Sequence, residues 1–152
     1  MQSWQKIDVV KNARVEQFIR LRDKNRQPYG AMAVIIAEVP ISGESRTEKL
    51  LFIGESKETF KDLREEGFIW EKAKLIAEGR ARRALAEHVG AKGFPRAPQK
   101  GDPNFGVVEQ KPVNHYVVSL DTLTHASPIG ERVKKHVPRF ILKKIGFVYE
   151  GK

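Results

Sequence analysis

The chain has 152 residues, of which 40% are hydrophobic, and a formal net charge of +9 without a single cysteine. This size and composition predict one domain over residues 1–152 that buries its own core, and the lack of cysteine excludes disulfides and thiolate metal sites. No run approaches the roughly 18 apolar residues of a membrane span, and residues 1–6 are too polar for a signal peptide, so we expect no membrane association and a cytoplasmic location.

The first third of the chain predicts a hairpin and a central strand. Residues 1–13 have few apolar anchors, and we expect a docked N-terminal arm or a short strand there. Residues 15–22 are followed by a turn-rich segment, 23–28, and a second strand-like run, an order that favours a hairpin. The near-continuous apolar run Ala31–Val39 predicts a strand buried on both faces, and residues 50–53 return as the next strand.

Two helical patterns follow. Ser56 is a candidate N-cap of a short helix, and Gly67 separates that helix from a longer one over residues 68–89. Gly90 is suited to end the long helix, because glycine readily adopts the left-handed conformation found after helix ends. The Gly- and Pro-rich segment 90–104 predicts a long mobile loop, and long loops inside a domain are usually functional or mobile.

The last third predicts two strands and a basic helix. Residues 105–109 and 113–120 have strand-like patterns. Pro128 is well placed at a helix start, and the helix that follows is expected to bend or restart at Pro138, which lacks an N–H. A short edge strand over residues 147–149 would complete the sheet.

Together these elements predict an α/β (α+β) fold. We expect a single domain with a mixed, mainly antiparallel sheet flanked by about three helices, because strand-like runs joined by short turns alternate with two long helical patterns.

The basic surplus lies at the two ends of the chain. Residues 1–29 contain seven basic and three acidic residues and residues 126–152 contain seven and two, whereas residues 30–65 contain five and seven. Such a surplus attracts phosphate backbones through counterion release, and anionic surfaces in general. The sequence therefore favours a small basic protein that binds DNA or RNA, with an acidic protein partner as the alternative.

The last helix carries the clearest basic face, because its cations surround an apolar stripe and must point to solvent or to a partner. Phosphate contacts need only Lys and Arg at flexible reach. We predict them from the long helix, the loop and the last helix, at Arg80, Arg83, Lys92, Arg96, Arg132, Lys135 and Arg139. Exposed aromatic side chains would add stacking on single strands, and the candidates are Tyr29, Phe94, Phe105 and Tyr149.

One arrangement resembles a known family. The segment Gly30–Val34, then Phe52–Lys57, two helices, a strand and a helix that opens near Glu131 resemble the layout of GIY-YIG nucleases over residues 30–147. In that family two tyrosines, a helix arginine and a glutamate assemble a metal-dependent phosphodiesterase site. The resemblance implies that Glu131 is a catalytic and metal-binding residue and that the cofactor is a divalent cation such as magnesium.

This chain departs from the family pattern at three positions. Met32 and Phe52 stand where the two tyrosines are expected, and Asp62 stands where the arginine follows the second motif. A side chain without a hydroxyl cannot handle a proton or orient the attacking water. The resemblance therefore implies either a GIY-YIG-like nuclease or a catalytically altered relative, and whether the protein is an enzyme stays open.

Three other functions compete. Residues 140–150 resemble the closing helix-Gly-Phe-strand of GNAT-type acyltransferases, although Gly79-Arg80-Ala81 lies inside a helical pattern where those enzymes bind pyrophosphate after a strand. Asp102 with Glu109-Gln110-Lys111 has the order of acidic and basic residues used by many metal-dependent nucleases. A protein-binding inhibitor or effector module would instead use the basic ends of the chain on an acidic partner.

Overall fold

Among the residues that the structure describes, four strands form one sheet in the order β1 (Val15–Arg22), β2 (Pro28–Pro40), β3 (Thr47–Lys57) and β4 (His115–Val118). The computed structural model describes residues 3–41, 45–91 and 114–149. All three strand pairs are antiparallel. The predicted α/β class with a mainly antiparallel sheet is confirmed.

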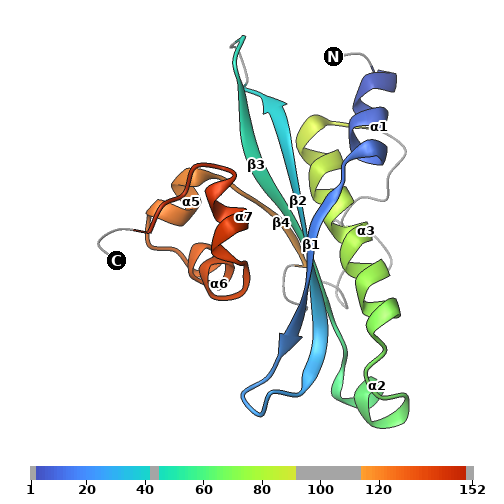
Figure 1. Cartoon of the computed structure of the whole chain (residues 1–152). Coiled ribbons are helices and arrows are strands. Elements are labelled where there is room, and N and C mark those ends of the chain that lie inside the picture. Colours follow the sequence, from blue (N-terminus) through green and yellow to red (C-terminus); the bar gives the residue numbers. More distant parts are fainter. Residues whose placement is uncertain (1–2, 42–44, 92–113, 150–152) are drawn as a thin grey trace, which may run out of the picture.

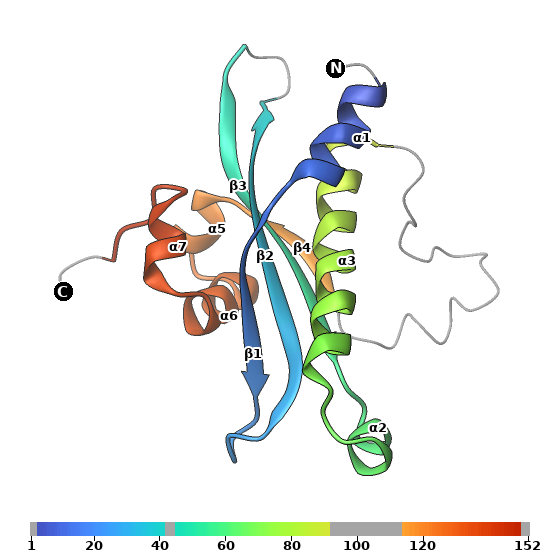
Figure 2. The same cartoon turned by 45° about the vertical axis from the view of Figure 1, so that its right-hand side comes forward.

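Helices cover both faces of this sheet (Figure 1). On one face lie α1 (Ser3–Asn12) and α3 (Trp70–Val89), with α2 (Phe60–Glu65) between β3 and α3. On the other face lie α5 (Leu120–Thr124), α6 (Pro128–His136) and α7 (Arg139–Lys143), as the turned view in Figure 2 also shows. Within the described part of the chain, no helix is long and apolar enough to cross a membrane.

The apolar run of β2 is explained by these two helical layers. Ala31, Ala33 and Ile35 belong to the core cluster beneath α3, whereas Met32 and Val34 belong to the cluster beneath α5–α7. Successive side chains of a strand point to opposite faces, so a strand covered on both faces needs apolar residues at every position. The expected central, doubly buried strand is confirmed, since β2 lies between β1 and β3.

Glycine and alanine let α3 pack closely on β3. The buried residues of α3 include Ala73, Ala77, Ala81 and Ala84. A Cβ atom at Gly54 of β3 would lie 2.2 Å from both the carbonyl oxygen of Ala77 and the backbone nitrogen of Ala81. Only glycine fits at this point, because both neighbouring atoms belong to the helix backbone.

The prediction that Ser56 caps the short helix is wrong. Ser56 lies within β3, where its hydroxyl accepts the backbone N–H of Ala31 at 3.2 Å and donates to the carbonyl oxygen of Ala73 at 2.9 Å. The N-cap is Thr59, whose side chain accepts the backbone N–H of Asp62 at 3.0 Å in a capping box. The strand therefore runs farther than expected, because the hydroxyl of Ser56 is already engaged between the sheet and α3.

The N-terminal segment is a helix and not a short strand. Arg82 of α3 donates from Nη1 to the carbonyl oxygens of Val10 at 2.8 Å and Ala13 at 2.7 Å. These carbonyls lie at the C-terminal end of α1, where helix carbonyls lack partners within the helix. A side chain about seventy residues away in the sequence thus holds α1 against α3.

The predictions for the second half of the chain are confirmed in part. The long helix and its stop at Gly90 are confirmed, with a left-handed φ of 74° at that glycine. The restart at Pro138 is also confirmed, because Val137 and Pro138 separate α6 from α7. The edge strand over residues 147–149 is wrong, since this segment is not a strand, pairs with none of the described strands, and packs Phe147 into the cluster beneath α5–α7. Residues 92–104 of the expected loop and the strand over 105–109 lie outside the described residues.

The substitution Gly54→Ala is expected to destabilise the protein by about 3 kcal/mol, because the added methyl group must push α3 away from β3. Urea denaturation of the purified chain measures this loss. Gly79→Ala, on α3 itself, is the matched control. Apart from the backbone of α3 itself, no atom of the described residues lies within 4 Å of its added Cβ, and the higher helix propensity of alanine should stabilise the protein by about 0.5–1 kcal/mol. Equal effects of the two changes would contradict the close packing of α3 on β3.

Candidate functional site

A buried carboxylate interrupts the apolar face of β3. Leu51 and Ile53 pack beneath α5–α7, and the alternation of the strand places Glu55 next on the same face. Glu55 is 1% exposed. A carboxylate at this depth loses its hydration, so it requires charged or hydrogen-bonding partners from the protein.

Those partners come from the sheet and from α6. Arg132 donates from Nε to Oε2 of Glu55 at 2.8 Å and from Nη2 to Oε1 at 2.5 Å, a two-point contact. The hydroxyl of Tyr116 on β4 donates to Oε2, and Nζ of Lys57 lies 3.8 Å from Oε1. Tyr29 on β2 lies close enough to Arg132 to help raise the pKa of its guanidinium. We call these five residues the Glu55 cluster.

The partners of Glu55 determine its ionisation. Burial acts to raise the pKa of Glu55, but the hydrogen bonds from Arg132 and Tyr116 and the nearby positive charges together hold that pKa below its ordinary value. The same bond to Glu55 raises the pKa of Arg132. Burial and the adjacent carboxylate raise the pKa of Tyr116 well above its usual range. Glu55 and Arg132 are therefore both charged at neutral pH, and Tyr116 keeps its proton.

His136 lies one turn after Arg132 on α6. Burial, together with the positive charges of Arg132 and Lys135, lowers the pKa of His136. The imidazole is therefore neutral at pH 7.

The Glu55 cluster combines one carboxylate with two cations, and Arg132 and Lys57 remain about one third exposed. It thus fixes α6 to the sheet and leaves an excess of positive charge at the surface.

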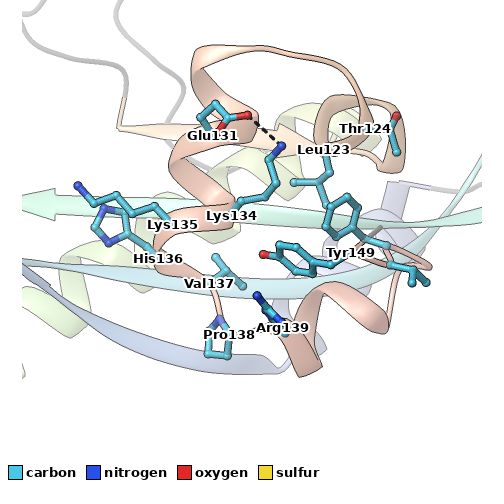
Figure 3. Close-up of a pocket in the computed structure, with 12 residues that line it drawn as sticks. Leu123, Thr124, Glu131, Lys134, Lys135, His136, Val137, Pro138, Arg139 and Tyr149 are labelled. Carbon is cyan, nitrogen blue, oxygen red and sulfur yellow. Dashed lines mark ion pairs between the residues drawn. The ribbon is translucent and has the colours of Figure 1, made fainter. Parts of the chain in front are cut away.

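A groove lies on the outer side of this helical layer. It has a volume of about 760 Å³ and is formed by α5, α6, the α6–α7 junction and residues 147–149. Among the described residues that line it are three cations, Lys134, Lys135 and Arg139, and one carboxylate, Glu131. Figure 3 shows Glu131, Lys134 and Arg139 around the ring of Tyr149, and it shows Lys135 extending away from that ring, beside His136. We call this feature the α6–α7 groove.

An aromatic pair lies at the α7 end of the groove. The guanidinium carbon of Arg139 lies 4.2 Å from the ring centroid of Tyr149. The ring of Phe147 meets that of Tyr149 edge-on, with centroids 4.9 Å apart and an interplanar angle of 76°. Phe147 is 8% exposed and anchors the segment in the core. Tyr149 is therefore held from two sides.

Glu131 lies away from the Glu55 cluster. Its side chain is 67% exposed and forms an ion pair with Lys134 at 2.9 Å. No group of three or more His, Asp or Glu residues within the described ranges is arranged to hold a metal ion. The acidic pattern at Asp102 and Glu109 lies outside those ranges. Met32 and Phe52, at the expected tyrosine positions, are buried in opposite core clusters.

The predicted phosphate contacts are divided between the two helical layers. Arg80 and Arg83 are half-buried on α3, and Arg80 donates to the carbonyl oxygen of Glu55 at 2.7 Å. Lys135 and Arg139 line the α6–α7 groove, whereas Arg132 is engaged by Glu55 on the sheet side of α6. Lys92 and Arg96 lie outside the described residues.

Sequence reasoning missed most of the Glu55 cluster. The sequence places Glu55 between the expected strand over residues 50–53 and the expected cap at Ser56, and it predicts no role for Glu55, Lys57 or Tyr116. One signal was present, because the alternation Leu51, Ile53, Glu55 places a charge where the pattern calls for an apolar residue. The partner of that charge could not be found this way, since Arg132 follows 77 residues later.

Comparisons with protein-family models, with curated proteins and with solved structures each gave no match. The resemblance to GIY-YIG nucleases therefore stays a prediction.

The substitution Glu55→Gln is expected to destabilise the protein by about 1–3 kcal/mol at neutral pH, because Arg132 and Tyr116 lose a charged acceptor. The effect also depends on pH. The native pKa of Glu55 lies below the ordinary value of 4.5. The ionised carboxylate therefore stabilises the folded state at pH values above about 4.5, and this stabilisation is lost as the pH falls through the native pKa. Urea denaturation from neutral to acidic pH should show the difference between the two proteins shrinking below about pH 4.5.

Glu131→Gln is the matched control, since it removes the same charge from an exposed ion pair on α6. It should change the free energy of unfolding by less than about 0.5 kcal/mol. A constant difference between wild type and Glu55→Gln at all pH values would contradict the ion pair.

Proposed function

We propose that the protein binds nucleic acid and that the α6–α7 groove is its contact surface. The observation that carries the proposal is the convergence of Lys134, Lys135 and Arg139 on one groove beside an aromatic ring. Phosphate contacts dominate the affinity of proteins for nucleic acids, and Lys and Arg supply them.

The surroundings of the groove support the same partner. Lys143 and Lys144, at the end of α7, are exposed and add two further cations to the same helical layer. The carboxylates nearby offset only part of this charge, because Glu131 pairs with Lys134 and Glu16 pairs with Lys144 at 2.9 Å. These pairs are at least partly exposed to solvent, where ion pairs contribute little and exchange readily with other anions. The cations therefore remain available to phosphate.

The Glu55 cluster supports the groove from beneath. Arg132 lies on α6 between the groove cations and the sheet, and Glu55 holds it at two points. A helix fixed in this way presents Lys135 in a defined position, and this lowers the entropic cost of forming a phosphate contact. Arg132 acts here first as an anchor of α6, and its exposed third adds to the positive field that phosphate meets.

The proposed binding should depend steeply on salt. Fluorescence anisotropy with labelled DNA and RNA is expected to show binding at about 50 mM salt that weakens strongly by about 200 mM, because released counterions drive the association. The double variant Lys135→Ala/Arg139→Ala should weaken binding about tenfold or more at low salt. It should also reduce the slope of log K against log salt by about 1 for each phosphate that the variant no longer neutralises.

The double variant Arg20→Ala/Lys24→Ala is the matched control. It removes the same charge from β1 and the adjoining hairpin turn. The guanidinium carbon of Arg20 lies 4.5 Å from the ring centroid of Trp70 on α3, away from the groove. Its affinity should stay within about twofold of wild type if the groove is the contact surface. Equal losses in the two double variants would assign binding to net charge alone, and no binding at low salt would refute the proposal. Polyglutamate that binds as tightly as nucleic acid would point instead to an acidic protein partner.

A further inference from the structure

Tyr149 is presented to the α6–α7 groove by a short anchored segment. Gly146 has a left-handed φ of 99° and turns the chain after α7, and the N–H of Phe147 donates to the carbonyl oxygen of Leu142 at 3.1 Å. Phe147 is buried, whereas Val148 beside it is 69% exposed. The segment is therefore extended over the helices and alternates, so that Tyr149 returns to the side of Phe147.

The ring of Tyr149 is fixed in the groove before any ligand arrives. Arg139 covers it at 4.2 Å and Phe147 supports its edge. Figure 3 shows the ring projecting into the groove, with its hydroxyl toward the α6–α7 junction. Arginine over an aromatic face forms a flat cationic layer on which a nucleobase can stack, and a base stacked on an aromatic side chain contributes affinity regardless of its sequence.

The dimensions of the groove suit one unit of a single strand. Its volume of about 760 Å³ lies within the range of about 300–1,000 Å³ that is usual for small-ligand sites, so it has room for a nucleotide unit. In a duplex the bases are stacked and paired, so only the backbone would reach Lys134 and Lys135, whereas a single strand can turn a base toward Tyr149.

We infer that the α6–α7 groove takes a single-stranded segment, with one unstacked base against Tyr149 and Arg139 and the adjoining phosphates on Lys134 and Lys135. This inference rests on the proposed function and narrows it to a substrate class. The competing explanation is that Tyr149 only shields Phe147 and the core beneath it from water.

The test compares single strands with duplexes of the same sequence. With labelled strands of about 15 nucleotides, wild type should bind the single strand more tightly at equal salt. Tyr149→Ala should weaken single-strand binding by about 5-fold to 100-fold and leave duplex binding within about twofold. Tyr149→Phe keeps the ring and should bind like wild type. Phe140→Ala is the matched control, because Phe140 is a 58% exposed aromatic on α7 that does not line the groove.

The melting temperature of Tyr149→Ala is compared with that of wild type, to detect misfolding of the variant. A second measurement does not depend on that variant. Ultraviolet cross-linking of a bromouracil-containing single strand to the unmodified protein should label Tyr149, as peptide mapping would reveal. The inference is overturned if duplex binds wild type as tightly as single strand, if Tyr149→Ala weakens both forms equally, or if the cross-link maps elsewhere. It is also overturned if a free mononucleotide competes as well as the strand. The proposed function survives each of these results as long as Lys135→Ala/Arg139→Ala still weakens salt-dependent binding.

Discussion

The two-point contact between Glu55 and Arg132 ties the C-terminal helices to the sheet. Most of the interface beneath α5–α7 is apolar, and apolar surfaces attract without fixing a direction. A carboxylate that is 1% exposed must instead meet its partners in a defined geometry, because an unpaired buried charge is costly. The pair, completed by Tyr116, therefore sets where α6 lies on the sheet.

The position of α6 in turn determines which side chains line the α6–α7 groove. Arg132 binds Glu55 on the sheet side of the helix, and Lys134, Lys135 and His136 line the groove. Val137 and Pro138 separate α6 from α7, so Arg139 lines the groove from the first position of α7. One helix thus uses some of its cations to hold the fold and others to build the cationic surface, and net charge alone does not separate these two roles.

The periodicity of the sequence predicted much of the fold. The doubly buried β2, the hairpin, the long α3 and the break at Pro138 follow from local rules of side-chain alternation, helix periodicity and proline geometry. The failures have a common physical cause. Ser56 was misassigned as a cap because its partners are the backbones of β2 and α3, and α1 was missed because Arg82 lies far away in the chain.

Local residue chemistry thus determined the fold class, the basic character of the ends and the cationic face of the last helices, because these properties depend on neighbours in the chain. Charge and helix periodicity alone predicted Lys135 and Arg139 as phosphate contacts, and both line the α6–α7 groove. Only the tertiary structure decided that Arg132 pairs with a buried Glu55, and that Tyr149 lies beneath Arg139 beside the groove. Pairing and stacking depend on distance in space, and folding brings together side chains whose separation in the sequence carries no such information.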